Sequence, residues 1–130
     1  MADLPRLLLI DDEPALADFM ANAATLTGYA PTITADRAQF EEAFAAATPD
    51  VVALDLGMPN TDGVEFLRYL AEHEYRGPVL IVSGFDRRVL ESAFRLGGAL
   101  GLEMVGPLEK PVRLEDLERL LLSVKPGMLP

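Results

Sequence analysis

Five side chains of this sequence stand at the ends of short apolar runs and could carry chemistry together. They are Asp11, Asp12, Asp55, Ser83 and Lys110. Carboxylate oxygens suit a hard divalent cation, and Mg²⁺ in particular keeps several waters and readily bridges to phosphate. Carboxylates gathered in one place repel, by about 4 kcal/mol for two charges about 4 Å apart at an effective dielectric constant of about 20. The group therefore predicts a cation nearby, and Lys110 supplies one positive charge.

These side chains also have simpler interpretations. Asp55 would merely open a turn, where aspartate is common. Asp11 and Asp12 would form a solvated cap on the helix that follows, and Lys110 would be an ordinary surface lysine. The arrangement of the elements that carry the five residues favours the chemical interpretation.

The stretch around Asp55 is the centre of the prediction. Val51–Leu54 is an apolar run bounded by turn signals, as expected for a strand buried on both faces, and Asp55 lies at its carboxyl end. Further strands are predicted over Leu7–Ile10, Ala30–Thr34 and Val79–Val82, with a last one beginning at Met104.

Amphipathic helices are predicted between these strands and after the last one. Pro14 opens the first helix, and Gly28 ends it. Capping boxes open the next two, formed by Asp36 with Gln39 and by Asp62 with Glu65. The fourth runs from about Asp86 to Leu100. The residues expected to face inward are Val89, Leu90, Ala93, Phe94 and Gly97 in the fourth helix, and Leu114, Leu117, Leu120 and Leu121 in the last.

Strand and helix thus alternate five times along the chain. That alternation predicts an α/β fold, in which a parallel sheet is covered on both faces by helices. Right-handed crossovers bring the carboxyl ends of all strands to one edge of the sheet. Ligands of open α/β sheets bind at that edge, so the five side chains are expected to share one crevice.

Composition narrows the function further. The chain has 130 residues, enough for one domain, and no cysteine, which excludes disulfides and suits a reducing cytoplasm. The formal net charge of −10 argues against direct binding of nucleic acid, which needs lysine and arginine on the phosphates. We expect no signal peptide and no membrane span, since no apolar run approaches about 18 residues.

Four motifs occur in the order of one known family. They are Asp11-Asp12-Glu13, the Asp55–Pro59 segment with Asp62-Gly63, Ser83-Gly84 and Lys110-Pro111. In these residues the sequence resembles the receiver (CheY-like) domain of bacterial two-component response regulators, over residues 6–124. The resemblance implies a flavodoxin-like doubly wound sheet of five parallel strands in the order 2-1-3-4-5, with five helices.

The resemblance also implies a role for each acid. Asp55 would be the phosphoacceptor, taking phosphate from a sensor histidine kinase or a phosphotransfer protein. Asp12 would hold Mg²⁺, with Asp11 acting partly through water, and Asp55 and the backbone carbonyl of Gly57 would complete the protein ligands. Positioning and charge neutralisation dominate phosphoryl transfer, which agrees with the interpretation drawn from the residues themselves.

Two further roles follow from the same resemblance. Ser83 would hydrogen-bond a phosphoryl oxygen. Lys110 would pair with Asp55 at rest and with the phosphoryl group afterwards, and its peptide bond to Pro111 would be cis. The implied protein is a signalling switch rather than an enzyme.

Two departures from the family concern the signalling face. Many receivers carry Tyr or Phe three residues before the lysine, where this chain has Pro107, so we doubt the usual aromatic coupling. Ser83 and Lys110 are 27 positions apart, several more than expected. We place the extra residues at Gly97–Leu102, as an added turn at the end of the fourth helix or as a longer loop after it.

A third departure concerns the lifetime of the phosphoryl group. Two residues after the phosphoacceptor and two after the serine, the family often has polar side chains that orient an attacking water. Here these positions hold Gly57 and Phe85. We therefore expect slow self-dephosphorylation.

The predicted organisation is a receiver domain over residues 1–124 and a tail or start of a linker over 125–130. The expected partners are the kinase or phosphotransfer protein and an output domain or partner protein, with a homodimer through the fourth helix, fifth strand and fifth helix as a further option. The main alternative is a pseudo-receiver, an interaction module independent of phosphorylation. Two other classes are disfavoured. A haloacid-dehalogenase-type phosphotransferase requires a second acid at the position that Gly57 occupies. A flavin-binding domain requires a loop after the first strand that binds phosphate, and Asp11-Asp12-Glu13 would repel phosphate without a metal.

Overall fold

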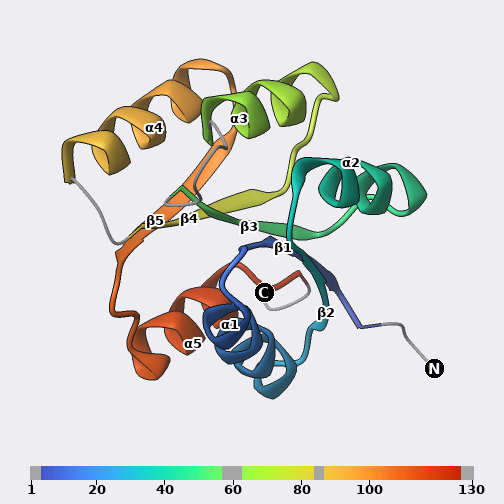
Figure 1. The fold of residues 1–130 in the computed structure, drawn as a ribbon, viewed down its shortest axis with the longest axis vertical. Helices are drawn as coiled ribbons and strands as arrows, with labels where there is room; N and C mark the ends of the chain where they lie inside the picture. Colours follow the sequence, from blue (N-terminus) through green and yellow to red (C-terminus); the bar gives the residue numbers. More distant parts are fainter. Residues whose placement is uncertain (1–3, 57–62, 84–86, 127–130) are drawn as a thin grey trace.

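The computed structural model describes residues 4–56, 63–83 and 87–126. Its centre is one sheet of five parallel strands in the order β2-β1-β3-β4-β5, with α1 and α5 on one face and α2, α3 and α4 on the other (Figure 1). The predicted doubly wound fold and its strand order are confirmed.

The strands follow the apolar runs of the sequence closely. They are β1 (Arg6–Ile10), β2 (Ala30–Thr34), β3 (Val51–Asp55), β4 (Pro78–Ser83) and β5 (Glu103–Glu109). Every residue of the central strand β3 is buried, and so are the last four of β1. These runs lack a polar face because helices cover the sheet on both sides.

Each face of the sheet has its own apolar core. Leu7, Leu9 and Ala53 point toward α1 (Pro14–Leu26) and α5 (Leu114–Ser123). Leu8, Ile10 and their neighbours point toward α2 (Arg37–Ala46), α3 (Gly63–Glu72) and α4 (Arg87–Ala99). Alternation along each strand therefore divides one apolar run between two cores. Among the described helices, none has the length and apolarity that crossing a bilayer requires.

Local signals in the sequence fix the helix ends. The Asp36 side chain accepts a hydrogen bond from the Gln39 amide at 2.8 Å, which confirms the predicted capping pair. Gly28 (φ +91°) ends α1 in a left-handed conformation, with the Tyr29 amide donating to the Ala24 carbonyl. The second predicted pair begins at Asp62, which lies outside the described residues.

The extra residues before β5 do not form a long loop. The described part of α4 has 13 residues, as many as α1 and three more than α2, α3 and α5. Gly101 (φ +90°) closes the helix, with the Leu102 amide donating to the Gly97 carbonyl. Only residues 100–102 separate α4 from β5, so the structure excludes the long loop, and the added turn of the helix stays a prediction.

Strand β5 is irregular around Pro107, the position at which many receivers carry Tyr or Phe. The pairing register with β4 shifts between Leu80 and Val82, opposite Gly106 (φ +91°) and Pro107. Pro107 is exposed and has no amide hydrogen to donate to a neighbouring strand. The side chain at this position therefore lies on the surface instead of inside the domain.

Two predicted inward residues are exposed, so the prediction was wrong for them. Val89 is 52% exposed, because the buried stripe of α4 runs through Leu90, Ala93 and Gly97 and leaves Val89 one helical step outside it. Leu114 is 40% exposed, since it is the first residue of α5 and the buried part of that helix begins at Leu117.

Candidate functional site

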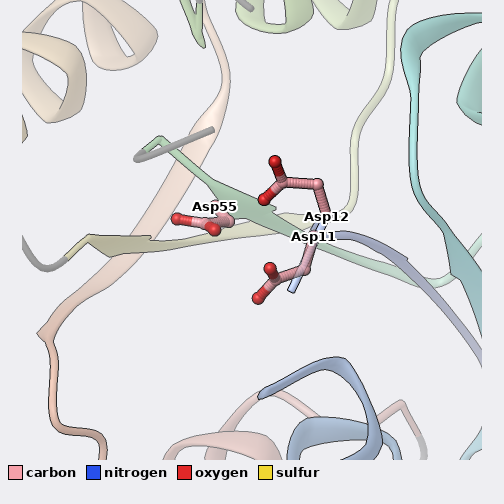
Figure 2. Close-up of side chains that lie close together, drawn as sticks. All are labelled: Asp11, Asp12 and Asp55. Atoms are coloured by element: carbon pink, nitrogen blue, oxygen red, sulfur yellow. The ribbon is translucent and has the colours of Figure 1, made fainter. Parts of the chain in front are cut away.

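Three carboxylates meet at the carboxyl edge of the sheet. Asp55 is the last residue of β3, and Asp11 directly follows β1, whose Ile10 pairs with Leu54 of β3. One oxygen each of Asp11, Asp12 and Asp55 lies within 4.8 Å of the others. Figure 2 shows the three side chains converging from the two neighbouring strand ends. Pairing of β1 with β3 is thus what brings residues 44 positions apart in the sequence together.

The two N-terminal acids differ in their surroundings. Asp11 is 2% exposed, whereas Asp12 is exposed. Asp11 Oδ1 accepts a hydrogen bond from the Glu13 amide at 2.9 Å. Asp11 Oδ2 is buried and has no hydrogen-bond partner among the described residues. The simpler interpretation of Asp11 as a solvated helix cap therefore does not hold.

Burial raises the pKa of Asp11 from its ordinary 3.8 to about 6, and repulsion from Asp55 acts in the same direction. The amide of Glu13 opposes this rise by donating to the ionised form. The carboxylates of Asp11 and Asp55 thus repel each other, as the sequence predicted, and a cation beside them would reduce this repulsion.

Lys110 lies against Asp55. Its Nζ donates to Asp55 Oδ2 at 3.1 Å, and the lysine side chain is 22% exposed against 2% for the aspartate. The peptide bond between Lys110 and Pro111 is cis, as expected. Lys110 is therefore a member of the site and not an ordinary surface lysine.

The oxygen atoms of the three acids suit Mg²⁺. Two oxygens on opposite sides of one Mg²⁺ ion are about 4.2 Å apart, because each bond is about 2.1 Å long. The carboxylate oxygens of the three acids lie up to 4.8 Å apart, which is slightly more than this distance. The acids would therefore move a little closer together on binding, or one of them would bind through a water. Asp11 Oδ2, for which the described residues offer no hydrogen-bond donor, is a buried acceptor that such an ion or its water would satisfy.

The remaining predicted site residues are placed only in part. Ser83 ends β4 and pairs in register with Glu109, the residue before Lys110, so its backbone lies beside the site. Its side chain and the whole of Gly57 lie outside the described residues, as does Phe85. The expectations on these groups stay predictions.

Sequence reasoning missed one residue that contacts the site. Thr34 ends β2, is 3% exposed, and its carbonyl oxygen accepts a hydrogen bond from the Asp11 amide at 3.1 Å. A signal was present, since a threonine at the end of a strand next to β1 must lie beside the first two acids once β1 and β2 pair.

The fold and the crevice define a class of protein, a flavodoxin-like α/β domain with an acidic site at the carboxyl edge of its sheet. The family model described as "Response regulator receiver domain" matches residues 7–122, and the chain belongs to this family of signalling domains.

Individual relatives agree with the family match. Regulatory protein VirG of Agrobacterium tumefaciens is 33% identical over 129 residues, which cover 97% of this chain and 46% of that protein. The positive alginate biosynthesis regulatory protein of Pseudomonas aeruginosa is 34% identical over 119 residues, covering 88% of this chain and 45% of that protein. The chain spans less than half the length of these curated relatives.

Solved structures show the same architecture. A response regulator from Colwellia psychrerythraea has a TM-score of 0.75 and 29% sequence identity, with 93% of this chain and 96% of that chain covered. Full-length FixJ from B. japonicum has a TM-score of 0.77 at 26% identity, with 92% of this chain and 57% of that chain covered.

Proposed function

We propose that this receiver domain is a phosphorylation-controlled switch with Asp55 as its phosphoacceptor. A sensor histidine kinase or a phosphotransfer protein would supply the phosphoryl group, and Mg²⁺ would be required. The receiver unit would comprise residues 1–124, and residues 125–130 would be a tail or lead into a linker. The phosphorylated form would change contacts with an output domain or a partner protein.

One observation carries this proposal. The carboxylate of Asp55 is buried, lies in contact with Lys110 at 3.1 Å, and shares its crevice with two further acids. A structural ion pair would need only one acid for one lysine. The two additional carboxylates bring negative charge that one lysine cannot balance, so their presence fits a cation that binds there.

The transfer itself needs little from the protein beyond position and charge. An oxygen of Asp55 forms a bond to phosphorus while the nitrogen–phosphorus bond of the donor's phosphohistidine breaks, and the imidazole leaves with the electron pair. When bound, Mg²⁺ supplies the positive charge that offsets the phosphoryl oxygens. Asp11, Asp12 and Asp55 would hold that ion, together with the backbone carbonyl of Gly57.

Lys110 and Ser83 would respond to the new group. Phosphorylation adds up to about two negative charges, which compete with the Asp55 carboxylate for the ammonium group of Lys110. The Ser83 hydroxyl would donate to a phosphoryl oxygen. Ser83 ends β4 and Lys110 directly follows β5, so a shift of these residues would be transmitted to that side of the domain.

Intact-mass measurement with acetyl phosphate tests the proposal. We expect a gain of one phosphoryl group that requires Mg²⁺ and is abolished by Asp55→Asn. Asp18→Asn is the matched control, because Asp18 is an exposed aspartate of α1 that does not belong to the cluster of three acids. No gain in the unaltered protein, under conditions in which a control receiver reacts, would overturn the proposal and favour the phosphorylation-independent module.

A further inference from the structure

Thr34 makes two hydrogen bonds that together hold the end of β1. Its hydroxyl Oγ1 donates to the Leu9 carbonyl at 2.8 Å. Its own carbonyl accepts from the Asp11 amide at 3.1 Å. Because these partners are two residues apart, Thr34 fixes the backbone on both sides of Ile10, the residue with which it pairs in register.

The position of the Asp11 carboxylate depends on this stretch of backbone. Asp11 is the first residue beyond β1, and its amide makes the last backbone hydrogen bond between β1 and β2. Its side chain is oriented by the Glu13 amide, and its main chain by Thr34. With one contact on each side, the carboxylate is held near Asp55 with Oδ2 buried and without a hydrogen-bond partner in the described part of the chain.

We propose that Thr34 is a positioning residue for the cation site, acting through Asp11. This inference rests on the proposed function, because it assumes that the three acids bind Mg²⁺. Thr34 is buried and would not touch the ion. It would set how far the first acid stands from the other two, and so how much the site must adjust when the ion binds.

Two substitutions separate the hydroxyl from the rest of the side chain. Thr34→Val keeps the shape and the branch at Cβ but places a methyl group against the Leu9 carbonyl. The end of β2 would then move away from β1, and the Thr34 carbonyl would move away from the Asp11 amide. Thr34→Ser keeps the hydroxyl and is expected to restore the contact.

Two other threonines serve as matched controls. Thr32 lies in the same strand and is exposed. Thr27 is 5% exposed and donates its hydroxyl to the Ala23 carbonyl at 2.9 Å, at the end of α1. Thr27→Val therefore removes a comparable buried hydrogen bond at a place that does not contact the acids.

The measurement is the Mg²⁺ dissociation constant, obtained by titrating Mg²⁺ alone and following backbone amide chemical shifts. Loss of groups that orient metal ligands typically costs about 10- to 100-fold in affinity. Thr34 acts one contact further away, so we expect Thr34→Val to weaken Mg²⁺ binding by about 3- to 10-fold. Amide hydrogen exchange at Asp11, measured without Mg²⁺, is expected to become faster in the same variant.

The outcomes separate the inference from its basis. Weaker Mg²⁺ binding in Thr34→Val, restoration in Thr34→Ser and unchanged binding in Thr27→Val and Thr32→Val would support it. Mg²⁺ binding and Asp11 exchange unchanged in Thr34→Val would overturn it, and so would equal weakening in Thr27→Val, which would indicate a general loss of stability. No Mg²⁺ binding by the unaltered protein would overturn the proposed function, and this inference with it.

Discussion

Replacing Asp11 by asparagine is expected to stabilise the protein when no Mg²⁺ is present. Asp11 and Asp55 place carboxylate oxygens within 4.8 Å of each other in a buried crevice. At an effective dielectric constant of about 20, that separation corresponds to a repulsion of about 3.5 kcal/mol. Asparagine keeps an oxygen that can accept from the Glu13 amide, and it removes the charge.

The raised pKa of Asp11 gives a second magnitude, in which burial is the largest cause and the repulsion from Asp55 is included. A carboxyl group whose pKa moves from 3.8 to about 6 on folding destabilises the folded state by about 3 kcal/mol once it is fully ionised. Asp12 beside these acids is exposed and Lys110 lies against Asp55, so we discount both figures for screening. We expect a net gain of about 1–2 kcal/mol in the free energy of unfolding.

The pH dependence has a definite sign. Below the unfolded-state pKa of 3.8, Asp11 is protonated in both states and the substitution changes little. Between pH 3.8 and about 6 the unfolded state loses the proton that the folded state retains, so stability falls and the advantage of Asp11→Asn grows across this range. Above about pH 6 Asp11 is ionised in both states and the advantage levels off.

Urea unfolding with and without EDTA, repeated across this pH range, measures the effect. Asp18→Asn is again the control for removing one negative charge from an acidic protein. Excess Mg²⁺ is expected to reverse the order, because ligand binding stabilises only the protein that retains the site. If Asp11→Asn lowered the stability of the metal-free protein near pH 8, the repulsion argument would be refuted.

Three further predictions concern other parts of the molecule. Burial raises the pKa of Tyr29 to about 12, so the folded state retains the proton that the unfolded state loses, and stability falls as pH rises from about 10 to about 12. Tyr29→Phe loses the hydrogen bond from Tyr29 Oη to the Leu121 carbonyl (2.7 Å), costing about 1 kcal/mol near neutral pH, and flattens that alkaline decline in urea titrations. Gly97→Ala is expected to lower the free energy of unfolding by about 1–3 kcal/mol, because the new methyl group would collide with the Met104 side chain; unchanged stability would contradict this. The phosphorylated protein is expected to lose phosphate slowly, and Gly57→Asn to speed that loss, as followed by intact mass over time; equal rates would count against the role assigned to position 57.

The acids and the lysine could be predicted from sequence because of where strands end. Each apolar run reports a buried strand, and a parallel sheet leaves only one edge at which Asp55 and Lys110 can lie. The sequence predicts that Asp55 and Lys110 lie near each other, but it does not predict the direct contact between their side chains. Nothing in the spacing of residues 55 and 110 fixes a distance of 3.1 Å between Nζ and Oδ2.

Other features depend on tertiary packing and left weak signals in the sequence. Val89 has an apolar side chain and helical spacing, but the direction of the buried stripe is set by how α4 lies on the sheet. The choice between a longer helix and a longer loop was open, because glycines such as Gly97 and Gly98 are compatible with either. The role of Thr34 depends on hydrogen bonds across two strands, which no periodicity reveals.

The two outer strands of the sheet also limit how this domain can meet other proteins. Each carries a proline, Pro31 in β2 and Pro107 in β5, and so lacks one amide hydrogen that strand pairing would use. Addition of an extended peptide to a sheet needs an uninterrupted row of such groups. Neither margin therefore offers a good template for a foreign strand, which protects the domain from edge-to-edge aggregation. We therefore expect partners to bind side chains on the helices and loops of this domain. A change of charge at Asp55 can alter the surface that these side chains form.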